Sequence, residues 1–230
     1  AMQFNETVPS WLYAMTDLKD LRLSKNNFVG SIPSELKSLR NLEVLHLDQN
    51  RFQGTFPDIF SHTPRLSDLR LQNNQFDGTV PRTIFNLQDL KYLLLDNNKF
   101  TGTIPGIIGT LIDVVTISMH LNQLEGTIPS TIGNLDDIVT LTLNSNNLKG
   151  TIPTQIGECF RMELLSLDQN KLTGSIPVEL GRLEHLKELR LEMNSFVGVE
   201  VPVEVCELTK SEALAHISAD CKKWAREMLI

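Results

Sequence analysis

Apolar and polar residues alternate along this chain in a pattern that repeats every 24 residues. Each unit opens with two apolar residues separated by one position and continues with an asparagine, a glycine and a proline at fixed offsets, except that the proline of the last unit comes one residue later. The units begin at residues 21, 45, 69, 93, 117, 141, 165 and 189. A fixed period of this length is typical of solenoids, whose units stack on one another. We therefore expect one elongated body.

Each fixed position has a physical role. Residues two apart in a strand point to the same face, so the opening pair predicts a short strand with one buried face, and stacked units predict a parallel sheet. The glycine permits a bend, and the proline predicts short irregular or 3-10 turns on the opposite side. Asparagine has two donors and an acceptor with which to satisfy backbone groups of its own and the neighbouring coil. The asparagine column is Asn26, Asn50, Asn74, Asn98, Asn122, Asn146, Asn170 and Asn194.

The two ends of the chain depart from the pattern. Residues 1–20 align with the second half of a unit, so we interpret the chain as a fragment of a longer array whose repeats occupy residues 1–208. After Leu208 we expect no further strand. Thr209 and Glu212 form a capping box, which predicts a capping helix over residues 209–230. Its apolar face would contain residues at three- and four-residue spacing: Leu214, Ile217, Cys221, Trp224 and Met228.

The half-unit LxGxIPxxLGxL resembles the plant-type leucine-rich repeat of receptor-like kinases, receptor-like proteins and polygalacturonase inhibitors. This resemblance implies an α/β fold, a right-handed leucine-rich repeat solenoid shaped as a horseshoe or superhelix. The parallel sheet would form its concave face and short turns its convex face. It also implies a binding role outside the cell, without a catalytic site. The segments 205–208 (VCEL) and 219–221 (ADC) resemble the ends of algal and diatom-like repeat proteins.

Charge and motifs narrow the classes of function. A formal net charge of −7 disfavours nucleic acid or an anionic membrane surface as the partner. No apolar run reaches the roughly 18 residues of a membrane span, and the start does not resemble a signal peptide, so membrane attachment would need segments outside this chain. We found no enzyme signature and no metal-ligand spacing. We therefore expect no catalytic residue, metal or cofactor, although a kinase domain could lie outside this sequence.

Three cysteines and one glycosylation motif bear on the compartment. Cys159 aligns with Leu135 and Leu183 of neighbouring units, which predicts a buried free thiol. Because the family resemblance points outside the cell, we favour a disulfide between Cys206 and Cys221. The alternative is a pair of reduced core cysteines in a cytoplasmic protein. Asn5 begins the sequence Asn-Glu-Thr, an acceptor site for N-glycosylation.

The outward residues of the sheet are the candidate binding surface. Charged residues gather at its two ends, whereas an aromatic, an aliphatic and polar side chains meet in the middle. Interfaces favour an aromatic anchor with polar surroundings. Ordinary variation on a solvated sheet explains the same pattern equally well. The candidate residues are Arg70, Tyr92, Leu94, Asp96, Thr116, Ser118, His120, Thr140 and Thr142.

These observations favour a non-catalytic module that binds a protein or peptide through its concave sheet. The first hypothesis is the ligand-recognition region of a receptor-like protein or kinase, at the cell surface or outside the cell. The second is a secreted inhibitor of a hydrolase. The third is an intracellular scaffold, which three reduced cysteines would favour.

Overall fold

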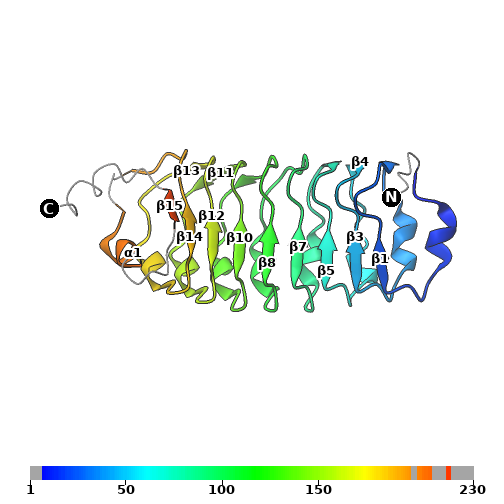
Figure 1. The fold of residues 1–230 in the computed structure, drawn as a ribbon, viewed down its shortest axis with the longest axis horizontal. Helices are drawn as coiled ribbons and strands as arrows, with labels where there is room; N and C mark the ends of the chain where they lie inside the picture. Colours follow the sequence, from blue (N-terminus) through cyan, green and yellow to red (C-terminus); the bar gives the residue numbers. More distant parts are fainter. Residues whose placement is uncertain (1–6, 198–200, 209–215, 219–230) are drawn as a thin grey trace.

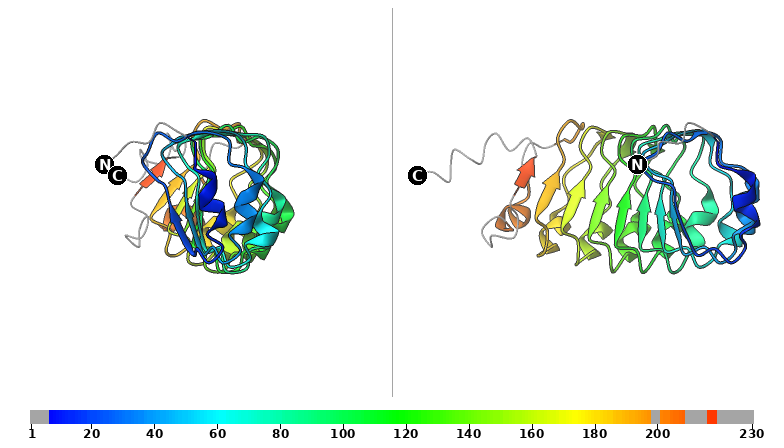
Figure 2. Two further views of the ribbon diagram at one scale, coloured as in Figure 1. Left: turned by 90° about the vertical axis from the view of Figure 1, so that its right-hand side faces the viewer. Right: turned by 45° about the vertical axis from the view of Figure 1, so that its right-hand side comes forward.

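The computed structural model describes residues 7–197, 201–208 and 216–218 of the 230-residue chain. In this part the chain forms a row of stacked coils (Figure 1). One strand of each coil lies on one side of the row, and one short helix lies on the other (Figure 2). The molecule is therefore the leucine-rich repeat solenoid that the period predicts.

The strand side is a parallel sheet in which nine strands are described, in chain order and with adjacent coils side by side. The register is constant: Leu45 lies opposite Leu21 and Leu69, each 24 residues away. In the strands from β1 to β14 of this sheet, the middle residue points into the core and its two neighbours point to the opposite face. The strands are β1 (Asp20–Arg22), β3 (Val44–His46), β5 (Asp68–Arg70), β7 (Tyr92–Leu94), β8 (Thr116–Ser118), β10 (Thr140–Thr142), β12 (Leu164–Ser166), β14 (Glu188–Arg190) and β15 (His216–Ser218).

The asparagine column links successive coils, as the sequence predicts. The Nδ2 group of Asn146 donates to the carbonyl oxygens of Leu143, at 3.1 Å, and of Met119 in the preceding coil, at 3.0 Å. Its Oδ1 accepts the backbone N–H of Leu124 at 2.9 Å. This pattern recurs from coil to coil and satisfies buried backbone groups that water cannot reach.

Beyond the asparagines the chain bends through the glycine column and forms two smaller parallel sheets. Gly54 and Gly126 have φ of 75° and 80°, the left-handed region that glycine adopts without steric cost. The strands are β2 (Val29–Gly30), β4 (Arg51–Thr55) and β6 (Gln75–Asp77) in one sheet, and β9 (Glu125–Gly126), β11 (Asn147–Gly150) and β13 (Lys171–Leu172) in the other.

The opposite side of the coils is formed by short 3-10 helices. Each five-residue member follows a proline; Pro33, for example, has φ of −79° and ψ of 155°, an extended conformation before the helix. Ser61 to Pro64 interrupt the second unit, where the helix shrinks to three residues and Thr63 is fully buried. The helices are η1 (Ser10–Ala14), η2 (Ser34–Ser38), η3 (Phe60–His62), η4 (Arg82–Asn86), η5 (Gly106–Thr110), η6 (Ser130–Asn134), η7 (Thr154–Glu158) and η8 (Val178–Arg182).

The C-terminal end differs from the expected capping helix over residues 209–230. An α-helix, α1 (Val203–Glu207), lies earlier, at the place where other coils have 3-10 helices. Residues 216–218 form strand β15 instead of helix, paired with β14 so that Ile217 lies opposite Leu189. The expectation of no further strand was wrong because the open edge of β14 has backbone groups that a strand can pair. The remainder of 209–230 lies outside the described residues.

Candidate functional site

The sheet face is defined here as the outward side chains of the large parallel sheet together with the residues two positions after each strand, such as Asp96 and His120, and it contains all nine candidate residues. They lie in columns across the coils because the 24-residue register places equivalent positions side by side. Strand β5 pairs with β7, β7 with β8, and β8 with β10, so the candidates occupy four consecutive coils. Adjacent strands are about 4.8 Å apart, and the candidates therefore share one continuous surface.

An ionic network occupies the first part of this surface. Asp68 accepts two hydrogen bonds from the guanidinium of Arg70, at 2.9 and 3.0 Å. On its other side the Nε2 atom of His46 lies 2.8 Å from Asp68 Oδ2, although outside hydrogen-bond geometry. The guanidinium carbon of Arg70 lies 5.9 Å from the ring centroid of Tyr92, within the range of a cation–π contact. Tyr92 therefore lies beside a fixed positive charge.

The hydrogen bond with Asp68 raises the pKa of Arg70, because the bond favours the charged guanidinium. Tyr92 is 38% exposed, so its ring can contact a bound molecule. A planar donor and an exposed aromatic ring side by side are typical of interface anchors. The arrangement can bind a carboxylate or stack on a flat group.

A second network, of hydroxyl, imidazole and carboxylate groups, lies on the next coils. The Oγ atom of Ser118 donates to Asp96 Oδ1 at 2.9 Å and accepts from Thr142 Oγ1 at 2.9 Å. The Nδ1 atom of His120 lies 2.9 Å from Ser118 Oγ. Since the serine hydroxyl has one hydrogen, these contacts are satisfied together when His120 has its hydrogen on Nδ1. The histidine Nε2 atom lies 3.7 Å from Asp96 Oδ2.

The remaining candidates connect the two networks. Leu94 is partly exposed between Arg70 and Ser118 in the register of adjacent strands. Thr116 and Thr140 continue the column of Tyr92 and are half-buried. The structure thus brings all nine residues onto one face and joins Asp96, Ser118, His120 and Thr142 by direct hydrogen bonds.

Sequence reasoning missed two residues of the ionic network, Asp68 and His46. A signal was available, because an acid and an arginine two positions apart point to the same side of a strand. Three strands have that pair: Asp20 with Arg22, Asp68 with Arg70, and Glu188 with Arg190. His46 could not be placed in the same way, since its contact with Asp68 crosses from one coil to the next.

Three further chemical features of the described residues concern metal binding, membrane spans and a buried cysteine. Within residues 7–197, 201–208 and 216–218, no group of three or more His, Cys, Asp or Glu side chains is arranged to hold a metal ion. In the same part of the chain, no helix is both long enough and apolar enough to cross a membrane. Cys159 is fully buried and donates to the carbonyl oxygen of Ile132 at 3.3 Å.

Two predictions involve residues outside the described part of the chain. Cys206 is half-buried in α1, but Cys221 is outside, so the disulfide between them stays a prediction. Asn5, the expected glycosylation site, is also outside.

Comparison with protein families supports the repeat assignment. One leucine-rich repeat family model matches residues 40–100, and a second leucine-rich repeat model matches residues 17–39 and 161–183. No curated protein sequence matches the chain.

Solved structures give three informative likenesses. The plant peptide hormone receptor RGFR1, in complex with RGF2, is 32% identical with a TM-score of 0.84, over 87% of this chain and 32% of that one. The Arabidopsis receptor kinase HAESA, in complex with the peptide hormone IDA and the co-receptor SERK1, is 33% identical with a TM-score of 0.87, over 93% and 35%. A plant ice-binding protein is 26% identical with a TM-score of 0.71, over 94% and 76%.

The chain thus spans about a third of the length of the two receptor chains, at 32% and 35%. The fixed register and the asparagine ladder agree with these likenesses, and the repeat models match residues 17–39, 40–100 and 161–183. The chain is therefore a plant-type leucine-rich repeat protein, similar in structure to the ectodomains of plant receptor kinases.

Proposed function

We propose that this chain is the ligand-recognition part of a receptor-like protein or receptor-like kinase and that it binds a protein or peptide through the sheet face. The observation that supports this most directly is the juxtaposition of Arg70, exposed Tyr92 and the hydroxyl–imidazole network on adjacent strands. Two similar structures, RGFR1 and HAESA, contain peptide hormones. A flat sheet with one aromatic anchor suits an extended peptide that crosses several coils.

The roles within the surface follow from its chemistry. The guanidinium of Arg70, oriented by Asp68, would receive a carboxylate or a backbone carbonyl of the ligand. Tyr92 and Leu94 would bury apolar side chains. His120 Nε2 would accept a hydrogen bond from a ligand N–H or hydroxyl, while Ser118 and Thr142 hold the imidazole in place.

A displayed library of random linear peptides tests this proposal. Peptides selected on the unchanged chain should lose about tenfold or more in affinity for Tyr92→Ala, the loss expected at a central interface anchor. Ile112→Ala is the matched control, since Ile112 is exposed but lies outside the sheet face. Selected peptides that bind Tyr92→Ala as tightly as the unchanged chain would contradict the proposed site.

We also propose that the chain functions at the cell surface or outside the cell, since similar solved structures are ectodomains of plant receptor kinases. A count of titratable thiols in the denatured, unreduced protein tests the compartment. One thiol means that Cys206 and Cys221 are bridged, as an oxidising environment permits. Three thiols would favour the intracellular scaffold.

A second candidate function, binding of ice, is favoured by a different surface. An exposed column of hydroxyl residues follows the glycine column, one per coil: Ser31, Thr55, Thr79, Thr103, Thr127, Thr151 and Ser175. The next coil has a glycine beside each of these residues, so no side chain projects over the column. A Cβ atom on Gly102, for example, would lie 3.0 Å from the Thr79 methyl carbon. A flat array of hydroxyl and methyl groups at about 4.8 Å spacing could order water.

Inhibition of ice recrystallisation distinguishes the two candidates. If the second candidate is correct, the unchanged chain inhibits crystal growth and the double variant Thr103→Arg, Thr127→Arg loses this activity. Tyr92→Ala should retain it, because Tyr92 lies on the sheet face. A chain that leaves crystal growth unaffected would exclude the ice-binding candidate and leave the peptide-binding proposal standing.

A further inference from the structure

A small hollow lies beside helix η8, on the helix side of the later coils. It is bordered by η8, by the turn that follows this helix, and by the turn after η7 in the preceding coil. Its volume is about 480 Å³, within the range of small-molecule sites. The lining residues are Phe160, Gly181, Arg182, Glu184 and His185.

Phe160 is exposed at a position where the repeat does not require an aromatic residue. Its side chain is 57% exposed, because the preceding residue, Cys159, fills the core. An exposed ring beside a hollow offers its face to a bound molecule. The equivalent positions of the other units are Arg40, Pro64, Gln88, Ile112, Asp136 and Glu184.

The polar side chains of the hollow are not used by the fold. Within residues 7–197, 201–208 and 216–218, the side chains of Arg182, Glu184 and His185 form no hydrogen bond or ion pair. A neighbouring charged residue is paired, since Arg161 lies 2.6 Å from Asp137. The donors and acceptors of the hollow can therefore exchange water for a ligand.

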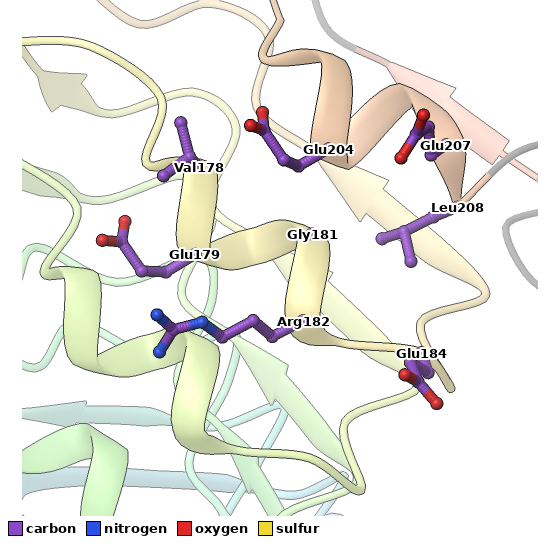
Figure 3. A pocket seen from close by; sticks show the side chains of 8 residues that line it. All are labelled: Val178, Glu179, Gly181, Arg182, Glu184, Glu204, Glu207 and Leu208. Carbon is purple, nitrogen blue, oxygen red and sulfur yellow. The ribbon is translucent and has the colours of Figure 1, made fainter.

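The lining favours an uncharged ligand. The charges of Arg182 and Glu184 cancel, so the hollow attracts neither anions nor cations strongly. The guanidinium donates hydrogen bonds, the carboxylate accepts them, and the imidazole of His185 can do both. Figure 3 shows Arg182 on η8 and Glu184 on the turn after it, with their charged groups pointing in different directions. These groups would therefore contact different parts of one ligand.

The frame of the hollow is rigid. A Cβ atom on Gly157 would lie 2.3 Å from the carbonyl oxygen of Glu179, so η7 rests directly on η8. On the other side, a Cβ atom on Gly181 would lie 2.6 Å from the Cβ atom of Glu204, so α1 also rests on η8. Because η8 is held between two helices, the hollow exists before a ligand binds, and little ordering is required.

We propose that this hollow binds an uncharged oligosaccharide of β-linked glucose, at a site separate from the sheet face. The hydroxyl groups of β-glucose are equatorial, so each side of the ring is an apolar face of C–H groups. These weakly positive C–H groups match the negative face of the Phe160 ring. The hydroxyls point outward from the ring edge, toward the polar groups of Arg182, Glu184 and His185.

A short peptide fits the lining less well than a sugar. Of the five lining residues, only Phe160 has an apolar side chain. A peptide anchor needs a desolvated pocket around its apolar side chain. A sugar needs one apolar face and a ring of hydrogen-bonding groups, which is the composition found here.

Calorimetric titration of the full chain with cellotetraose tests the proposal. Phe160→Leu should weaken binding about tenfold, because leucine retains an apolar side chain but removes the ring face. Phe160→Trp should bind at least as tightly as the unchanged chain. Ile112→Ala is the matched control, since Ile112 is exposed at the equivalent position two coils earlier. A chain that does not bind cellotetraose at millimolar concentration overturns the proposal, as does equal binding by Phe160→Leu.

Two further measurements separate this site from an ionic site and from the sheet face. Binding of the neutral sugar should not change between about 0.05 and 0.5 M sodium chloride, whereas a steep fall would show an ionic contact and overturn the proposal. Tyr92→Ala should bind cellotetraose normally, and Phe160→Leu should bind the selected peptides normally, so each proposal can fail alone. Loss of sugar binding in Tyr92→Ala would place the sugar on the sheet face.

A second variant covers the case in which Phe160→Leu does not fold. Arg182→Ala changes an exposed side chain and should weaken cellotetraose binding several-fold, with an unchanged circular dichroism spectrum. Full affinity in folded Arg182→Ala would show that the sugar is not held in this hollow.

Discussion

The N-terminal and C-terminal coils fill the same 24-residue template in different ways. In the first coils the core position seven residues after each repeat start is phenylalanine, and the rings stack at centroid distances of 6.0, 6.0 and 6.2 Å: Phe28, Phe52, Phe76 and Phe100. In the next three coils Leu124, Leu148 and Leu172 occupy that position, and the last coil has Phe196 there. One half therefore has a continuous aromatic stack and the other a smaller aliphatic core.

The helix side also differs between the two halves. The later coils have glycine where the first have Lys37, Ser61 and Phe85. A Cβ atom on Gly109, Gly133 or Gly157 would lie within 2.4 Å of a carbonyl oxygen of the next coil. The two halves should therefore respond differently to equivalent substitutions.

The largest expected effect is at the aromatic stack. Phe76→Ala should destabilise the protein by about 3–5 kcal/mol, because it removes a buried ring that contacts rings on both sides. Leu148→Ala, at the equivalent position of the later coils, should cost less because it removes no ring contact. Urea denaturation followed by circular dichroism measures both. Equal losses would show that the stack adds nothing beyond buried volume.

A smaller loss is expected at the glycines of the helix side. Gly157→Ala should cost about 1–3 kcal/mol, because the added methyl group would lie 2.3 Å from the carbonyl oxygen of Glu179. Lys37→Ala at the equivalent position of the first complete repeat should change the free energy of unfolding by less than about 0.5 kcal/mol, since Lys37 is exposed. The same denaturation measurement applies. If both variants are neutral, the close packing of the later coils is not rigid.

A pH-dependent effect is expected at Cys159 in the later coils. Burial, with smaller contributions from Asp136 and Glu158, raises the pKa of its thiol to about 12. The folded chain therefore keeps a proton that the unfolded chain loses above its ordinary pKa of 9.0. Stability should fall as the pH rises from 9 toward 12, with a slope of at most about 1.4 kcal/mol per pH unit from this group.

Cys159→Leu is the matched variant, because Leu135 and Leu183 occupy the position in adjacent coils. It should reduce the slope without abolishing it, since burial also raises the pKa of Tyr13 to about 12. Denaturation midpoints at several alkaline pH values provide the measurement. An unchanged slope in Cys159→Leu would show that the thiol does not titrate with unfolding.

Most of the fold followed from the period, because each position of the repeat has one physical role in every coil. The strand register, the asparagine ladder and the positive φ of the glycines are consequences of that regularity. Strand β15 was missed because Ile217 lies 28 positions after Leu189, so the period alone does not reveal the pairing. In the candidate site, the columns of outward residues across the strands could be predicted from the period. The contacts around Asp68 could not, because they depend on side-chain conformations that the repeat pattern does not determine.

The smallest expected effect concerns the residue before each asparagine, where every coil has a left-handed backbone. Asn73 and Asn97 of the earlier coils have φ of 58° and 52°, and Leu121 of a later coil has φ of 52°. Asparagine tolerates this region better than leucine, whose Cβ crowds the following carbonyl oxygen. Leu121 is also 49% exposed, so its side chain contributes little burial.

Leu121→Asn should therefore stabilise the protein by about 0.5–1 kcal/mol. Asn97→Leu should destabilise it by a similar amount, and thermal unfolding of the two variants measures both changes. Destabilisation by Leu121→Asn would show that the leucine makes contacts that outweigh its backbone strain.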